Sequence, residues 1–468
     1  MAHTETIQLA DERYVMTSRT RMWVLVLIVA GLVLTAAGIF THKSGAGHHE
    51  EHATSQVHDG NEHGDAAKYE AGEEPKSPAH EYDHASEVKG TAHNNIDDAS
   101  HGHAPSWTAR IWSNLLVNSW YFFLLSVMGT FFVAVNYIAN AGWATTLKRI
   151  PEAMGAYLPV ALVTLLVVAA LGAHDLYHWM HEGVTEPGHP NYDKIIAGKS
   201  PFLNSGFLYG GTVVIMAIFI LFQWILRKNS LREDEVGGLA NYNKSFRSSA
   251  AFTFIFAFAF SILSWLLVMS VDVHWFSTIF SVYNFATGFV ASLAVMTLLV
   301  IFLKAQGYLT IVTDEHLHDL GKFMFAFSIF WTYIWLAQYL LIWYANIPEE
   351  TVYFIERRFT SPYSWVFYLN LVLNFGLPFL LFMTRDSKRQ LSTLKLICPI
   401  VVVGHWFDFY NMVTPGVMKL EGAVGFLEIG VALIFAAAFL LVTLGSLAKI
   451  PLVGRNHPML QESLHHHI

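Results

Sequence analysis

The sequence is poor in cysteine and in charge. Its 468 residues include one cysteine, Cys398, which excludes an internal disulfide, an iron–sulfur cluster held by four thiolates and a haem attached through Cys-x-x-Cys-His. Only 14% of the residues are charged, against about 25% in soluble domains, and 54% are apolar. A membrane protein with no covalently bound cofactor and no redox centre of its own is therefore expected.

Ten apolar runs are long enough to cross a bilayer as helices. They lie near residues 22–40, 111–138, 157–180, 203–227, 248–271, 277–303, 320–345, 362–384, 392–413 and 424–447. These runs predict an all-α polytopic membrane protein of about ten transmembrane helices. Arg13, Arg19 and Arg21 precede the first run as in a signal peptide, but its core is long for a signal, so an uncleaved helix is favoured.

Lysine and arginine are divided unevenly between the two ends of the predicted helices. The segments at the end that includes residues 1–21 and 448–468 hold 15 of them, and the short loops at the opposite end hold five. Because basic residues are retained in the cytoplasm, we expect both termini there. The expected location is a bacterial inner membrane.

Residues 41–108 form an acidic segment that we expect in the periplasm. They hold 13 Asp and Glu against four Lys, and 11 His lie between residues 41 and 104. So polar a segment cannot bury a core, and we expect it to be largely disordered. His48, His49 and His52 could scavenge a metal, but the tract has no closed ligand spacing, so no metal site is predicted.

Charged groups inside membrane helices cost about 2.5–3.5 kcal/mol each, which makes the remaining ones candidates for function. Three predicted helices end toward the periplasm with histidine and aspartate: His174, Asp175, His178 and His181 in the third, Asp272 and His274 in the fifth, and His405 and Asp408 in the ninth. A neutral histidine or an ionised aspartate can accept the protons that a quinol releases on oxidation. His405, Asp408, Asp272 and His274 are therefore the candidate catalytic residues.

Further polar residues are candidates for a proton pathway. They are His174, Asp175 and His178 near the periplasm, Asn284, Gln338 and Asn374 within the membrane, and His316, His318 and Asp319 at the cytoplasmic mouth of the seventh helix. The alternatives are an interfacial belt of amphipathic rings, amides that join helices, and a solvated loop with helix-capping acids. We assign no function to the histidines at the C-terminus.

Four segments resemble one known family. They are residues 271–278 (VDVHWFST), 318–322 (HDLGK), 334–339 (IWLAQY) and 343–350 (WYANIPEE). They resemble the second large membrane subunit of bacterial alternative complex III, a quinol:cytochrome c oxidoreductase, which is similar to the membrane subunits of polysulfide reductases. The likeness covers most of residues 105–450. It implies two four-helix bundles, residues 109–271 and 272–413, flanked by the terminal helices 22–40 and 414–447.

The resemblance also implies partners and a division of labour. The partners would be a sister membrane subunit of the same fold, an iron–sulfur subunit, periplasmic c-type cytochromes and a terminal oxidase, beside lipids and without nucleic acid. The haem and iron–sulfur clusters would belong to those partners, and this chain would contribute a quinone-like cavity or a proton pathway. In that family the productive quinol pocket is expected in the sister subunit.

Two alternatives from other functional classes stay open. A proton-coupled secondary transporter could use the same histidines and aspartates, but no pair of interrupted helices is evident in the sequence. A haem-b cytochrome could use pairs among His174, His178, His274 and His405 as axial ligands. Solute uptake by the isolated chain, or a haem spectrum of it, would separate these alternatives.

Overall fold

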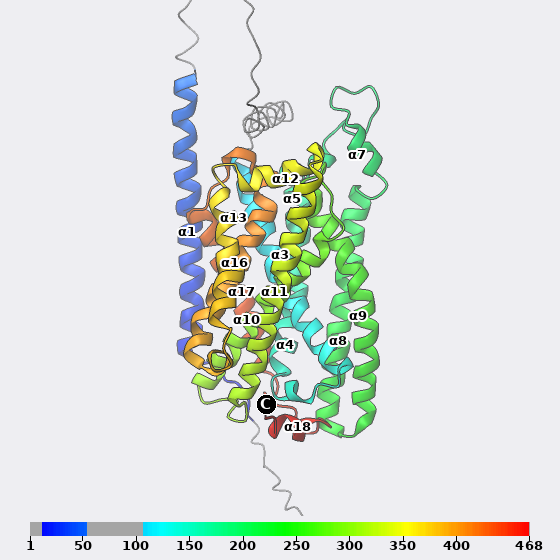
Figure 1. Ribbon diagram of the computed structural model, residues 1–468, viewed down its shortest axis with the longest axis vertical. Coiled ribbons are helices and arrows are strands. Elements are labelled where there is room, and N and C mark those ends of the chain that lie inside the picture. The colour runs from blue at the N-terminus through cyan, green and yellow to red at the C-terminus, as the bar shows by residue number, and fades with distance from the viewer. Residues whose placement is uncertain (1–11, 54–105, 468) are drawn as a thin grey trace, which may run out of the picture.

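The computed structural model describes residues 12–53 and 106–467 (Figure 1). Ten helices in this part of the chain are long and apolar enough to cross a membrane, and the described residues contain no strand beyond a single bridge between Arg13 and Pro451. The prediction of an all-α polytopic membrane protein is confirmed. Residues 54–105 and the side chains of His48, His49 and His52 lie outside the described residues, so the predictions made for them stay predictions.

Four spans form a first ring of helices. They are α3 (Trp107–Ile138), the pair α4 (Arg149–Met154) and α5 (Leu158–Leu171), α8 (Thr212–Val236) and α9 (Leu239–Leu267). Helix α3 packs against α5 and α9, and α8 packs against both α5 and α9, so the ring is closed. We call this ring the first bundle.

Four more spans form a second ring. They are α10 (Phe280–Ala305), α11 (Asp314–Ala345), the continuous segment α13 (Ser364–Leu371), η6 (Val372–Gly376) and α14 (Leu377–Leu381), and α16 (Leu391–Met418). Helix α10 packs on α11 and α16, α13 packs on α16, and α14 packs on α11. This second bundle joins the first where α3 packs on α10 and α16.

The first and last spans lie together outside the two rings. Helix α1 (Ser18–Ala53) runs along α17 (Phe426–Leu447), which packs on α3 and α4 (Figure 1). Gly31, Gly38 and Gly430 let the two backbones approach, because a Cβ atom at Gly38 would lie 2.5 Å from the Leu427 nitrogen. Close packing of small residues is what joins helices in lipid, where the hydrophobic effect does not.

Aromatic side chains fill the junction between the bundles. Phe131 of α3 has ring contacts with Phe256 of α9 and with Phe285 and Phe289 of α10, at centroid distances of 5.0 to 5.7 Å. In lipid such contacts stabilise the fold through dispersion and ring electrostatics. This packing places α3 and α10 at the centre of the molecule.

The loops gather at two ends of the molecule. One end, which we call the terminal face, holds Tyr14, whose ring packs 5.7 Å from Tyr308, and the C-terminal helix α18 (Leu460–Leu464). The opposite end, the α7–α12 face, holds α7 (Lys194–Lys199) and the short helix α12 (Pro348–Arg358) (Figure 1). The first described residues and the C-terminal residues thus share a face, as an even number of spans requires.

The predicted ends of several spans are wrong. Helix α1 continues to Ala53 and not only to residue 40, the fourth span ends at Val236 and not at 227, and the fifth begins at Leu239 and not at 248. The third span covers Arg149–Leu171 and does not continue to residue 180. At Gly172 the backbone leaves the helical region, with φ −94° and ψ 4°, and Tyr177 is extended, so a one-turn helix α6 (Ala173–Leu176) and a 3₁₀ turn η3 (His178–Met180) follow. Helix α16 continues to Met418, five residues past the expected end.

Candidate functional site

Asp408 of α16 is the centre of a buried polar cluster in the second bundle. Its side chain is 1% exposed and accepts hydrogen bonds from Thr287 Oγ1 at 3.0 Å, Trp331 Nε1 at 2.9 Å and Asn370 Nδ2 at 3.5 Å, and from the Tyr283 hydroxyl. The donors come from α10, α11 and α13. A carboxyl group inside a membrane protein is costly unless such donors surround it, and here three neighbouring helices supply four donors.

His405 lies one turn before Asp408 on α16, as the spacing predicts. Its ring is fully buried and meets Trp331 edge to face at 5.6 Å, and neither ring nitrogen has a hydrogen-bond partner within the described part of the chain. Both amide atoms of the buried Asn374 also lack a partner there. Asn374 sits in the π-helical turn η6 and lies against Gly404, where a Cβ atom would be 2.2 Å from its Oδ1.

A small cavity opens beside Asp408 toward the α7–α12 face. Its walls are aromatic and polar: Tyr283, Trp335, Gln338, Tyr353, Phe354, Arg357, Phe367, Asn411 and Met412. Gln338 Nε2, a donor, and Asn411 Oδ1, an acceptor, are both buried without a partner among the described residues. Tyr283 belongs to the cavity wall and to the cluster around Asp408. The cavity and the buried carboxyl are therefore neighbours through one hydroxyl group.

Asp272 pairs with Arg357, which lines this cavity. Its Oδ2 accepts a hydrogen bond of 2.7 Å from Arg357 Nη2, and Arg357 also donates to the carbonyl oxygens of Asn411 and Met412. The Arg357 guanidinium is buried over the Tyr353 ring, 3.4 Å from the ring centre, and Tyr353 stacks on Trp275. Asp272 thus holds an arginine in place and does not contact Asp408.

His274 lies apart from the other three catalytic candidates. Its side chain is 51% exposed and its Nε2 lies 2.6 Å from Asp193, the residue that caps α7. The expectation that His274 joins His405 and Asp408 is not met, because the chain turns outward after Asp272 instead of continuing into the bundle.

His174, His178 and His181 gather at the α7–α12 face, but not along one helix face. The His174 and His181 rings stack at 4.4 Å, and the His178 and His181 rings lie 4.9 Å apart. The break at Gly172 and the bend at Tyr177 bring them together. Burial and the neighbouring His181 lower the pKa of His178 below its ordinary value. Asp175 accepts from Ser106 and Thr108, which anchors the start of α3.

The titratable residues at the start of α11 lie at the terminal face and contact the C-terminal tail. His316 forms a capping box with Thr313 and lies 3.1 Å from Ser463 Oγ. Asp319 lies 2.7 Å from His466 Nε2. His318 is buried beside them, and its Nδ1 has no partner within the described residues. The sequence contained no signal that the C-terminal histidine His466 reaches this cluster.

Asn284 does not join the Asp408 cluster. Its Oδ1 accepts from Trp120 Nε1 at 2.9 Å and its amide donates to the Phe280 carbonyl, so it connects α10 to α3. The hydroxyl groups of its neighbours Tyr283 and Thr287, one turn apart on α10, donate hydrogen bonds to the Asp408 carboxyl group. The sequence analysis did not single out Tyr283, Thr287 or Arg357. The spacing of Tyr283 and Thr287, one helical turn apart, was a signal that could have identified them. Arg357 could be recognised from the sequence only as one of the charges in a loop.

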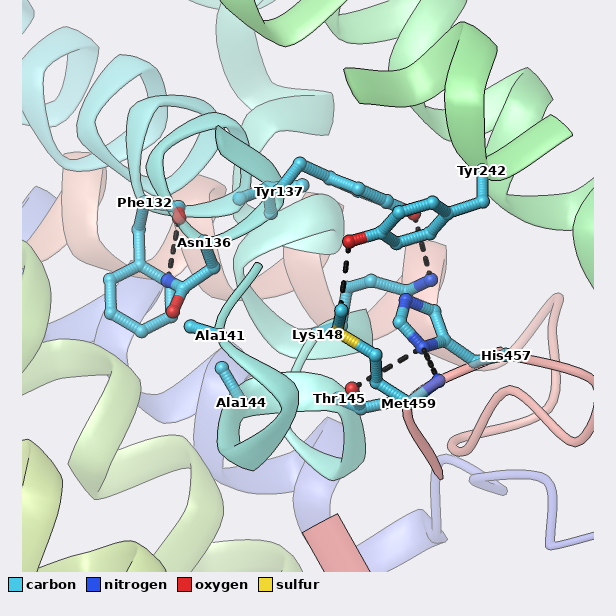
Figure 2. Close-up of a pocket in the computed structure, with 11 residues that line it drawn as sticks. Phe132, Asn136, Tyr137, Ala141, Ala144, Thr145, Lys148, Tyr242, His457 and Met459 are labelled. Carbon is cyan, nitrogen blue, oxygen red and sulfur yellow. Dashed lines mark hydrogen bonds between the residues drawn. The ribbon is translucent and has the colours of Figure 1, made fainter. Parts of the chain in front are cut away.

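A second cavity opens at the terminal face of the first bundle (Figure 2). Lys148 donates to the Tyr137 hydroxyl at 3.0 Å, and His457 lies 3.4 Å from Thr145 and from Glu233. Figure 2 shows Lys148, Tyr242 and His457 converging on this cavity from three parts of the chain. The contacts of His457 with Thr145 and Glu233 bind the loops of the first bundle to the C-terminal tail, which also reaches Asp319 of the second.

Comparisons with known proteins do not identify the chain. No protein-family model matches it, and no curated protein matches it. The statements about its function therefore rest on the residues and contacts described above.

Proposed function

We propose that this chain is a membrane subunit of a respiratory quinol:cytochrome c oxidoreductase of the alternative complex III kind. In this proposal the small cavity of the second bundle widens to admit a quinone headgroup, and Asp408 takes up a proton beside it. The supporting observation is that Tyr283 lines the cavity and also donates a hydrogen bond to the buried Asp408. A hydroxyl in that position can relay a proton between the cavity and the carboxyl.

The residues around the cavity suit a quinone chemically. A quinone carbonyl needs a donor and a quinol hydroxyl needs an acceptor, and Gln338 Nε2 and Asn411 Oδ1 are one of each, buried and without a partner among the described residues. Trp335, Tyr353 and Phe367 supply flat apolar walls. The bound quinol would supply two electrons to partner cofactors, while residues of this chain orient the ring and accept protons.

Between α11 and α16 the polar contacts around Asp408 do not continue toward the terminal face within the described residues. On α11, Met324 lies about 10 Å along the helix from Trp331 toward the terminal face. Its sulfur lies 3.9 Å from the buried Cys398 of α16, so the contact between these two helices is apolar at that level. The Asp408 cluster and the cluster of His316, His318 and Asp319 are thus separate, and the proposal is a proton half-pathway at each end.

The proposal also includes the orientation of the chain in the membrane and its partner subunits. The terminal face carries the larger number of lysines and arginines, which supports a cytoplasmic position for both termini in a bacterial inner membrane. The α7–α12 face would then meet the periplasm, where the c-type cytochromes and the iron–sulfur subunit would dock. A sister membrane subunit and a terminal oxidase complete the proposed assembly.

The test starts from the chain in its native membranes. We would purify it in mild detergent and record co-purifying subunits, haem, iron and quinol:cytochrome c activity. If haem and iron–sulfur subunits accompany it, Asp408→Asn in the whole complex should lower quinol oxidation about 100-fold. Asp386→Asn, a change at an exposed residue of helix α15 (Arg385–Arg389), is the matched control. Full activity of Asp408→Asn would remove Asp408 from the proposal.

A proton-coupled transporter stays a second candidate. The third span of each bundle contains a π-helical turn, Phe207–Gly211 in the first and Val372–Gly376 in the second. Interruptions at matching positions are a feature of transporter binding sites. The first turn opens its span whereas the second lies within its span, so the expectation that no such pair exists stays a prediction. Proton-dependent solute uptake by the isolated chain in proteoliposomes would support this candidate.

The haem-b alternative has less support. Among the candidate ligands, His174 and His178 pack on His181, His274 pairs with Asp193, and within the described part of the chain the ring of His405 packs on Trp331 and on no second histidine. Absorption spectra of the isolated chain reconstituted with haem would test it.

A further inference from the structure

Arg358, the last residue of α12, lies in an aromatic cage at the α7–α12 face. Its guanidinium lies 4.9 Å from the Phe359 ring centre, 5.2 Å from that of Tyr339 and 5.5 Å from that of Trp343. Its Nη1 donates to the Tyr339 hydroxyl and its Nε to the Tyr368 hydroxyl at 3.3 Å. Rings and hydroxyls from α11 and α13 therefore hold the planar group in one orientation.

The charge of Arg358 has no carboxylate partner among the described residues. Of the other charged residues of α12, Arg357 pairs with Asp272, and Glu356 lies 3.4 Å from Lys419. Glu349 and Glu350 lie in the first turn, at the opposite end of the helix. An arginine carries five N–H donors, and two of those of Arg358 are used. The remaining donors form a fork that matches the oxygens of a phosphate group.

The surface next to Arg358 is apolar and exposed. Tyr333, Leu336, Leu340 and Tyr344 form one exposed stripe along α11, since they lie three or four residues apart, and Tyr344 is 93% exposed at its end. Trp343, Phe359 and Tyr368 are also exposed around the cage. Aromatic rings at the end of a membrane span mark the headgroup level of the bilayer.

We propose that Arg358 and its aromatic cage form a binding site for the phosphodiester of a membrane phospholipid. The acyl chains would lie along the exposed stripe of α11 while the phosphate pairs with the guanidinium. Charge complementarity, the depth of the site and the continuous apolar stripe support a phospholipid. This proposal is independent of the proposed function, because it involves neither Asp408 nor the cavity.

Arg358 could instead serve only to stabilise the C-terminus of α12, where a positive charge interacts favourably with the helix dipole. The two roles differ in what they require of the ligand. A phosphate site distinguishes a phospholipid from a neutral glycolipid with the same acyl chains, and it prefers the arginine fork to a lysine. If Arg358 only stabilises the helix, the choice between phospholipid and glycolipid should make no difference.

The experiment measures lipid binding to the full chain by native mass spectrometry in detergent. Short-chain phosphatidylglycerol and a diglucosyl lipid with the same acyl chains are the probes. We expect Arg358→Gln to weaken phosphatidylglycerol binding about tenfold, Arg358→Lys to weaken it less, and the glycolipid to bind both proteins equally. Arg232→Gln, an exposed arginine at the end of α8, is the matched control and should change nothing.

Three outcomes would overturn the proposal. The first is unchanged phosphatidylglycerol binding in Arg358→Gln, and the second is glycolipid binding as tight as that of phosphatidylglycerol. The third is displacement of the lipid by millimolar inorganic phosphate, which would indicate a site for the free anion. If Arg358→Gln does not fold, Tyr368→Phe removes a hydroxyl that orients the guanidinium and should weaken phosphatidylglycerol binding in the same direction.

Discussion

The hydroxyl of Tyr283 joins the cavity of the second bundle to the buried carboxyl of Asp408. Without that hydroxyl the carboxyl keeps its bonds from Thr287 and Trp331 but has no polar link to the cavity wall. The tyrosine is thus the point at which the chemistry of the cavity and that of the carboxyl meet.

Tyr283→Phe should therefore affect the stability of the protein and the activity of the complex, and the two effects can be measured separately. Loss of a hydrogen bond to a charged group costs about 1.5–3 kcal/mol of stability, and loss of the proton relay should slow quinol oxidation by the complex about 100-fold. Thermal unfolding in detergent and quinol:cytochrome c assays measure the two effects. Tyr353→Phe is the control, because Tyr353 lines the same cavity through its ring. Equal activity of the two variants would contradict the relay.

Asp272 and Arg357 should be coupled energetically. Arg357 is 2% exposed, so its charge depends on the 2.7 Å pair with Asp272. Removal of one partner from a buried pair costs about 3–5 kcal/mol, because the other charge is left buried. Asp272→Asn and Arg357→Gln should each destabilise the protein, and the double variant should lose less than the sum. The free energy of unfolding measured by denaturant is the readout, and additive losses would refute the coupling.

His457 predicts a pH dependence of stability. Burial, with the charges of Lys148 and Arg149, lowers the pKa of His457 well below its ordinary value of 6.5. In the unfolded chain His457 can bind a proton that it does not bind in the folded chain. Its burial therefore costs no stability above about pH 7, and it lowers the stability increasingly below about pH 6.5. At pH 5 the loss is about 2 kcal/mol.

Melting temperatures at pH 7.5 and pH 5 test this prediction. His457→Gln should reduce the difference between them, whereas His465→Gln, an exposed change in the same tail, should not. If the difference between the two melting temperatures is unchanged in His457→Gln, a group other than His457 causes the pH dependence.

Gly38→Val should detach α1 from α17. A Cβ atom at Gly38 would lie 2.5 Å from the Leu427 nitrogen, a backbone atom that cannot move aside. A cysteine placed at Ile434, which lies under Gly31, should then react faster with a membrane-permeant maleimide. Gly445→Val of α17 is the control, since nothing lies within 4 Å of its added Cβ. Slow labelling of both variants would show that α1 tolerates the side chain.

The sequence by itself determined the class of fold. Ten apolar runs specify ten spans, because the backbone N–H and C=O groups of a chain in lipid must form their hydrogen bonds within a helix. A long apolar run in the sequence therefore predicts a membrane-spanning helix. It also marked His405 and Asp408 as neighbours, because residues three apart share a helix face. The local break at Gly172 was missed, since glycine alone does not say whether a helix ends.

Only the tertiary structure decided which side chains meet. Asp408 is surrounded by groups that come from three other helices, and Asp272 faces Arg357 from a loop 85 residues away. His274 turned outward and His466 reached Asp319 across the terminal face. Helical periodicity fixes neighbours within one helix, whereas contacts between helices depend on how the rings of helices close, and that follows from packing over the whole chain.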